Sequence, residues 1–165
     1  MKYLKSNTDK LIVLLDTLEL VLKKARSRWP KMRAGFCFVF HGRPHFNLVL
    51  KGMIGKVIDS EIDRYHDFAD EKASRLTVSS GMYYSSYQTR KPELEKYGGA
   101  IRGKNFILSI SGLASEHEDE AVAMATLILC KEMDELVAND LAESTGNKIF
   151  AQLLADCRNT NSSTN

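Results

Sequence analysis

The sequence has little cysteine and little proline, and this scarcity excludes several classes of protein. Its 165 residues contain three cysteines, three prolines and one tryptophan. The cysteines, Cys37, Cys130 and Cys157, are odd in number and widely spaced, and they form no CxxC motif. We therefore expect neither a disulfide framework nor a structural zinc site. This cysteine usage is typical of a reducing compartment, and the predicted location is the cytoplasm.

The sequence also lacks an excess of charge of one sign and long apolar runs. The net charge is only +2, which is too small to predict binding to nucleic acid or to an anionic membrane. The first residues show no signal-peptide core, and no apolar run approaches the length of a membrane span. The sequence therefore predicts neither a nucleic-acid partner nor a membrane partner.

The familiar catalytic motifs are missing as well. The sequence contains no G-x-S-x-G elbow, no P-loop and no dinucleotide fingerprint. His41 and His45 are four apart, but Gly42 and Pro44 separate them and no third ligand is close in sequence, so a metal site is not expected. Cys37 lies in an apolar segment, where a thiol usually acts as a small hydrophobic group. These observations favour a protein without enzymatic activity.

The composition is that of an ordinary globular domain, with 44% hydrophobic and 27% charged residues. We expect residues 1–157 to form a single domain. Residues 158–165, rich in Asn, Ser and Thr, are expected to form a disordered tail.

Four segments show the 3.6-residue apolar period of helices. The first runs from Thr8 or Asp9 to a stop at Pro30, and the second begins at Asp59 or Ser60. The third begins near Ser115 or Glu116, where Ser115 and Glu118 have the capping-box form, and extends to about residue 143. The final helix carries an apolar stripe ending at Cys157. The predicted inner face of the third helix comprises Ala121, Met124, Ala125, Ile128 and Leu136; the stripe of the last comprises Ile149, Phe150, Leu153, Leu154 and Cys157.

Between these helices lie two predicted pairs of strands. Residues 34–40 and 45–50 read as a hairpin across a Gly- and Pro-containing turn at 41–44. Residues 97–113 read as strand, glycine turn and strand, and the apolar run 106–110 suits a strand buried on both faces. The order of elements predicts an α+β fold with a central antiparallel sheet flanked by helices, a class that includes the profilin-like folds.

Two motifs resemble those of the GlcG/HbpS-like family, also called the haem-degrading-domain family. Ala69, Lys72 and Ala73 match the A-x-x-K-A signature on that family's second helix. The segment from Gly98-Gly99 to Ser111-Gly112-Leu113 is similar to its second signature. The resemblance implies a profilin-like α–β–α sandwich, a homo-oligomer, and binding of haem, a corrinoid-related molecule or another small ligand.

The sequence departs from the family pattern inside the second signature. Phe106 and Ser109 stand where the family usually has glycines. Because glycine in a strand permits close approach of a ligand, larger residues here are expected to fill or reshape the pocket.

The resemblance implies a ligand site of six residues. Lys72 would pair with an anionic group, the tyrosines would stack on a planar ligand, and glycine N–H groups would act as donors. The residue chemistry alone favours the alternative that the tyrosines cover the sheet or a subunit interface. The six residues are Lys72, Tyr83, Tyr84, Gly98, Gly99 and Ser111.

Three functions are compatible with these features. The first is an oligomeric small-ligand-binding or accessory protein, with haem among the candidate ligands. The second is a protein-interaction module whose pocket is closed by Phe106 and whose final helix exposes its apolar stripe. The third is a haem-degrading or other small-molecule enzyme.

Overall fold

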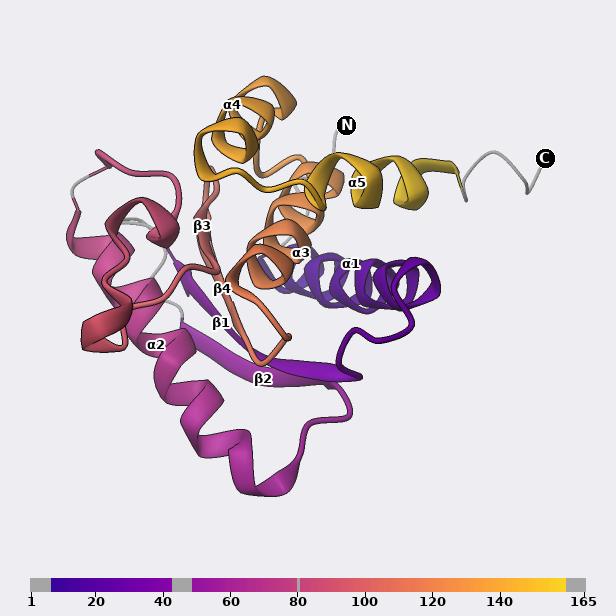
Figure 1. Cartoon of the computed structure of the whole chain (residues 1–165). Coiled ribbons are helices and arrows are strands. Elements are labelled where there is room, and N and C mark those ends of the chain that lie inside the picture. The colour runs from indigo at the N-terminus through magenta and orange to yellow at the C-terminus, as the bar shows by residue number, and fades with distance from the viewer. Residues whose placement is uncertain (1–6, 43–48, 80, 160–165) are drawn as a thin grey trace.

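A four-stranded antiparallel sheet lies at the centre of the molecule, with strand order β2-β1-β4-β3. The computed structural model describes residues 7–42, 49–79 and 81–159 (Figure 1). The strands are β1 (Gly35–Gly42), β2 (Val49–Gly55), β3 (Ala100–Arg102) and β4 (Phe106–Ser111). The long-range pairing of β1 with β4 joins the two predicted hairpins into one sheet.

Helices cover both faces of this sheet (Figure 1). α2 (Ile62–Val78) packs on one face, and α1 (Asn7–Arg28) and α3 (Glu116–Leu129) pack on the other. α4 (Glu135–Thr145) leads to α5 (Phe150–Arg158), which packs on α1 and α3. The predicted α+β class and its helix–sheet–helix layers are confirmed. No helix in the described ranges is long and apolar enough to cross a bilayer.

β4 separates two cores, as its near-continuous apolar sequence predicts. Phe106, Leu108 and Ile110 belong to the large core beneath α1 and α3. Ile107 belongs to a smaller core beneath α2, together with Val39, Ala69, Ala73, Leu76 and Ala100. Since successive side chains on a strand point to opposite faces, Ser109 and Ser111 also lie on the α2 side. The small residues on this side allow α2 to approach the sheet closely.

α3 is the most buried helix of the fold. Every residue from Asp119 to Ile128 is buried, as expected for a helix covered on all sides. Its predicted start is confirmed, because Ser115 is the N-cap and its hydroxyl accepts from the Glu118 N–H at 3.2 Å. The Glu118 carboxylate accepts from the Ala114 N–H rather than from Ser115.

The predicted end of this helix, at about residue 143, is wrong. α3 ends at Leu129, Lys131 adopts a left-handed backbone with φ of 60°, and α4 begins only at Glu135. Leu136, predicted to face inward, is 78% exposed. No glycine or proline marks this break. A prediction from the apolar period alone therefore treats the two helices as one.

The first hairpin is shifted relative to its prediction. The returning strand is β2 at Val49–Gly55. The first two residues of the predicted turn, His41 and Gly42, belong to β1, while the rest of that turn and the predicted strand start fall on residues 43–48, which lie outside the described residues. Gly52 sits inside β2 because a Cβ there would lie 2.7 Å from the Phe38 ring. The glycine therefore makes room for an aromatic side chain and does not end the strand.

The final helix also differs from its prediction. Its apolar residues Phe150, Leu153, Leu154 and Cys157 are buried against α1 and α3, so they offer no exposed stripe for a partner. The helix extends to Arg158, the first residue of the predicted tail, and Arg158 pairs with Glu135 at 2.7 Å. Residues 160–165 of that tail lie outside the described residues.

Candidate functional site

An open pocket of about 410 Å³ lies between α2 and the connection from β4 to α3. Its volume falls within the range of small-molecule sites. α2 supplies four of the lining residues, and most of the others come from the β4–α3 connection and the first turn of α3. The lining residues are Arg64, Tyr65, Phe68, Lys72, Tyr97, Ser111, Gly112, Leu113, Ala114, Ser115, Glu116 and Asp119.

One face of α2 forms an aromatic wall of this pocket. Tyr65, Phe68 and Lys72 are three and four positions apart, so they lie on the same face over two helical turns. The Phe68 ring packs edge-on against Tyr97 with centroids 5.4 Å apart, and the Arg64 guanidinium lies 5.3 Å from the centre of the Phe68 ring. The wall therefore combines aromatic surface with a cation at its rim.

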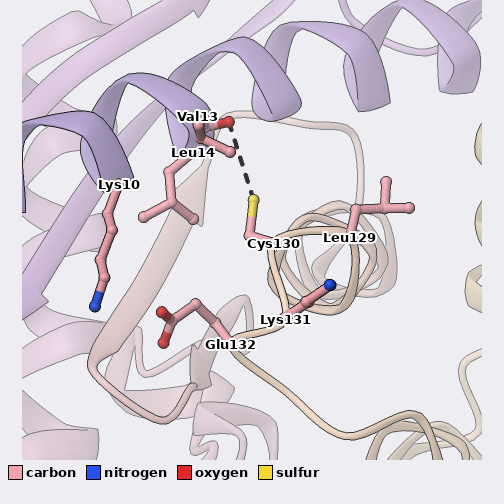
Figure 2. A pocket seen from close by; sticks show the side chains of 7 residues that line it. All are labelled: Lys10, Val13, Leu14, Leu129, Cys130, Lys131 and Glu132. Atoms are coloured by element: carbon pink, nitrogen blue, oxygen red, sulfur yellow. Dashed lines mark hydrogen bonds between the residues drawn. The ribbon is translucent and has the colours of Figure 1, made fainter. Parts of the chain in front are cut away.

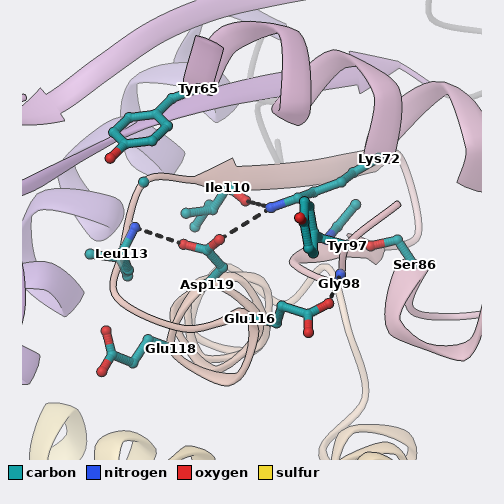
Figure 3. A network of polar contacts seen from close by, with 12 residues as sticks. Tyr65, Lys72, Ser86, Tyr97, Gly98, Ile110, Leu113, Glu116, Glu118 and Asp119 are labelled. Atoms are coloured by element: carbon teal, nitrogen blue, oxygen red, sulfur yellow. Dashed lines mark hydrogen bonds and ion pairs between the residues drawn. The ribbon is translucent and has the colours of Figure 1, made fainter. Parts of the chain in front are cut away.

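A buried ion pair forms the floor of the pocket (Figure 3). The Lys72 side chain is 2% exposed, and its Nζ donates to the Ile110 carbonyl at 2.8 Å and to Asp119 Oδ2 at 3.1 Å. The other carboxylate oxygen of Asp119 accepts from the Leu113 N–H at 3.1 Å. A lysine ammonium has three donors, so one Nζ–H has no acceptor within the described part of the chain.

Burial changes the acidity of the carboxyl group in this pair. Loss of hydration raises the pKa of Asp119 from 3.8 to about 6, while the charge and hydrogen bond of Lys72 partly oppose the rise. Perturbed acids in a pocket are a common feature of functional sites. The Asp119 carboxyl group therefore takes up a proton at a higher pH than an ordinary aspartate does.

Two glycines with left-handed backbone make room for this arrangement. Gly99 has φ of +116°, and a Cβ there would lie 2.8 Å from the Asp119 Cβ and 3.0 Å from Lys72 Nζ. Gly112 has φ of +129°, and a Cβ there would lie 2.9 Å from the Tyr65 ring. Both positions therefore require glycine for backbone conformation and for space.

The structure brings together only part of the site predicted from sequence. Lys72 and Ser111 line the pocket, and Gly99 lies directly behind the ion pair. Gly98 lies beside them, and its N–H donates to the Glu116 carboxylate (Figure 3). Glycine is needed at position 98 because a Cβ would lie 2.7 Å from the Tyr87 ring.

Tyr83 and Tyr84 do not join this pocket. Tyr83 is half-buried against the smaller core, and its carbonyl accepts from Arg102 Nε at 2.9 Å. Tyr84 is 46% exposed. The placement of Tyr83 agrees with the alternative in which a tyrosine covers the sheet.

The predicted closure of the pocket by Phe106 is wrong. Phe106 lies in the core on the opposite face of the sheet, where its ring centroid is 6.2 Å from that of Phe40. Ser109 does not line the pocket either; its buried hydroxyl has no hydrogen-bond partner among the described residues. Phe106 and Ser109 therefore leave the pocket open.

Sequence reasoning missed Tyr65, Phe68, Tyr97 and Asp119 as members of the site. The helical stripe on α2 could have found Tyr65 and Phe68, because both share a face with Lys72. Asp119 is 47 positions from Lys72, and its place in the first turn of a helix suggested only favourable interaction with the helix dipole.

A second hollow, of about 320 Å³, lies between α1 and the end of α3 (Figure 2). Cys130 lines this hollow; its thiol donates to Thr17 Oγ1 at 3.3 Å, and burial raises its pKa. A raised pKa makes a thiol less reactive. This hollow is therefore a weaker candidate for a reactive site than the pocket at Lys72.

Another buried carboxylate, that of Glu120, has a structural role. It accepts from Ser85 Oγ at 2.6 Å, from Thr145 Oγ1 at 2.9 Å and from Asn147 Nδ2 at 3.0 Å. These donors satisfy the carboxylate and tie α3 to two loops. Within the ranges that the structure covers, no three His, Cys, Asp or Glu side chains lie close enough to hold a metal ion.

Comparison with known proteins identifies no relative of this chain. No family model matches the sequence, no curated protein matches it, and no solved structure matches the fold. The resemblance to the GlcG/HbpS-like family therefore rests on the two sequence motifs alone.

Proposed function

We propose that this protein binds a small molecule in the pocket between α2 and α3. The observation that carries the proposal is that Lys72 lines an open pocket and that its ammonium retains one donor without an acceptor in the described part of the chain. Keeping a buried ion pair is costly, and replacing such a pair with apolar residues is often neutral or stabilising. A ligand that accepts a hydrogen bond from the third N–H of Lys72 explains why the protein keeps this buried pair.

The lining indicates a compact ligand with one oxygen acceptor and an apolar or aromatic body. A carboxylate or carbonyl oxygen suits Lys72, and a ring suits the surface formed by Phe68 and Tyr97. Two cations, Arg64 and Lys72, and two acids, Glu116 and Asp119, line the pocket. This balance favours a ligand with little net charge over a multiply charged anion.

The lining fits haem less well than it fits such a ligand. Among the pocket residues, only the phenols of Tyr65 and Tyr97 resemble known axial ligands, since the lining contains no His, Cys or Met. The Tyr65 hydroxyl already accepts from Arg33 at 2.5 Å. We therefore favour a compact ligand, and haemin enters the test as the competing candidate.

The test measures binding of benzoate by ligand-observed NMR and of haemin by its Soret absorbance. Benzoate should bind the native chain, and Phe68→Ala should weaken binding by about tenfold, which corresponds to about 1.4 kcal/mol. Tyr84→Ala is the matched control, because this tyrosine lies outside the pocket and its loss should leave the affinity unchanged. Equal losses in both variants, or saturable haemin binding without benzoate binding, would contradict the proposal.

A second candidate function is self-association through β2. Its outer edge has no strand partner in the described ranges, and it carries Val49 at 54% and Met53 at 48% exposure. An open strand edge is a template for pairing with another chain. This feature supports the homo-oligomer expected from the family resemblance, with β2 as the contact.

A further inference from the structure

We propose that Lys72 forms an imine with the carbonyl carbon of an aryl aldehyde or ketone bound in the pocket, with Asp119 accepting the proton of the ammonium. The proposed ligand class also carries one carboxylate. This inference rests on the proposed ligand-binding function and adds covalent chemistry to it.

The geometry provides a direct route for the proton. Lys72 Nζ and Asp119 Oδ2 are 3.1 Å apart, and the two side chains are only 2% and 6% exposed. Desolvation disfavours separated charges, so it lowers the cost of the neutral pair, amine and carboxylic acid. The raised pKa of Asp119 also favours the neutral pair, because the carboxyl group holds a proton more readily.

The amine keeps a free position for a ligand. The Ile110 carbonyl, 2.8 Å from Nζ, holds one N–H and fixes the end of the side chain. After the proton moves to Asp119, rotation about the Cε–Nζ bond turns the nitrogen lone pair toward the pocket. The nitrogen then attacks from a fixed position, which avoids the entropy of ordering a flexible lysine.

The reaction is a condensation without redox change. The lone pair of Nζ forms a bond to the carbonyl carbon while the proton held by Asp119 passes to the carbonyl oxygen, and the Asp119 carboxylate takes one N–H proton back, which gives a neutral carbinolamine. Asp119 then donates this proton to the hydroxyl, which leaves as water as the C=N bond forms, and the carboxylate takes the remaining N–H proton. The products are one imine and one water, so no oxidant or reductant is required.

The position of Arg64 indicates the carboxylate on the ligand. Arg64 and Lys72 are eight residues apart on α2, which places their Cα atoms about 12 Å apart along the helix axis. Both side chains are long, and Phe68 lies between them in the pocket wall. A rigid ring with a carbonyl at one end and a carboxylate at the other can therefore contact both cations.

The chain contains an internal control for this chemistry. Lys51 pairs with Asp70 as Lys72 pairs with Asp119, but these side chains are 47% and 35% exposed and lie outside the pocket. Solvent screens the charges of this exposed pair, so the two side chains interact only weakly. A comparison of Lys72 with Lys51 therefore separates the effect of burial in the pocket from the effect of a neighbouring aspartate.

The experiment uses 4-formylbenzoate with cyanoborohydride, which reduces an imine to a stable amine, followed by peptide mass spectrometry. We expect one adduct on Lys72, with a mass increase equal to the reduced aldehyde residue, formed about tenfold faster than on Lys51, as predicted for a preorganised nucleophile. Benzoate should slow labelling of Lys72 and leave Lys51 unaffected. Asp119→Asn, which cannot take the proton, should slow labelling of Lys72 by about a hundredfold.

Each remaining outcome has a defined meaning. Labelling of Lys72 no faster than that of Lys51, or labelling that benzoate does not slow, overturns the imine proposal. If benzoate binds the pocket but Lys72 forms no adduct, the imine proposal fails and the proposed function stands. If benzoate does not bind at all, both fail. The benzoate competition needs only the native chain, so it decides the matter even if Asp119→Asn does not fold.

Discussion

At the scale of single residues, the ion pair of Lys72 and Asp119 should matter more for stability than any surface pair. Removing one partner of a buried pair leaves the other charge uncompensated, which costs about 3–5 kcal/mol. We expect Lys72→Met to lower the free energy of unfolding by this amount in urea titrations. Lys51→Met removes a lysine from an exposed pair, so its effect should be at most about 1 kcal/mol. Equal effects of the two changes would show that the buried pair contributes no more than a solvated one.

The raised pKa of Asp119 predicts a specific pH dependence of stability. Between pH 3.8, its usual pKa, and about 6, its pKa in the folded chain, the folded state holds more protons at this group than the unfolded state. Its contribution to stability is therefore full at low pH and falls as pH rises through about 6, by up to about 3 kcal/mol.

Asp119→Asn tests this dependence. The difference in unfolding free energy between the native chain and the variant should shift against the native chain as pH rises from about 4 to about 7. Urea titrations across this range give the difference directly. A difference that stays constant, or that shifts in favour of the native chain, would mean that the folded-state pKa of Asp119 is not raised.

How far the sequence predicts the site depends on how local each residue's signal is. Lys72 and Ser111 lie within short motifs, and both line the pocket. Asp119 meets Lys72 only after β4 and α3 fold back on α2, so no local pattern reveals the pair. Tyr83 and Tyr84 looked suitable by chemistry, but the loop that carries them runs beside Arg102 and away from the pocket.

At the scale of elements, α3 holds the molecule together through Glu120 as well as through its apolar surface. Glu120→Ala would leave the donors of Ser85, Thr145 and Asn147 without their acceptor. We expect a loss of about 3 kcal/mol in unfolding free energy, because hydrogen bonds to a charged group are among the stronger ones. Glu143→Ala, on the exposed side of α4, is the control and should change stability by less than about 0.5 kcal/mol.

Hydrogen exchange separates this explanation from a general loss of stability. Amides in the 3-10 helix Ser86–Thr89 and around Asn147 should lose protection first in Glu120→Ala. Uniform loss of protection across the whole sheet would show that Glu120 does not act by tying α3 to these two loops.

The helices and strands were predictable where the apolar period agreed with the residues that normally start or end such elements. The start of α3 carried an N-cap serine followed by an apolar run, and the structure confirms it. The break after Leu129 has no glycine or proline to mark it in the sequence. Lys131, a residue that does not signal a helix end, adopts the left-handed conformation there. The second strand shows the opposite error: it was predicted to end at residue 50, but it continues through Gly52 to Gly55, and a Cβ at position 52 would lie 2.7 Å from the Phe38 ring.

At the scale of the whole molecule, the unpaired edge of β2 predicts the mode of self-association. Antiparallel pairing of two β2 edges would join two sheets into one, and Val49 and Met53 would lose exposed apolar surface at the contact. We expect sedimentation velocity of the native chain to show a dimer or larger assembly. The combined change Val49→Glu with Met53→Glu should shift it toward monomer, because like charges across an interface repel.

Leu136→Glu is the matched control for this prediction. Leu136 is 78% exposed on α4, so the change adds a charge at an exposed apolar site far in the topology from β2. It should leave the assembly state unchanged, and circular dichroism should show that all variants keep their fold. A native chain that sediments as a monomer, or an assembly that survives both charges on β2 but dissociates with Leu136→Glu, would exclude the β2 edge as the contact. Because no residue of β2 lines the pocket, the benzoate affinity of the β2 variant should match that of the native chain, which separates assembly from ligand binding.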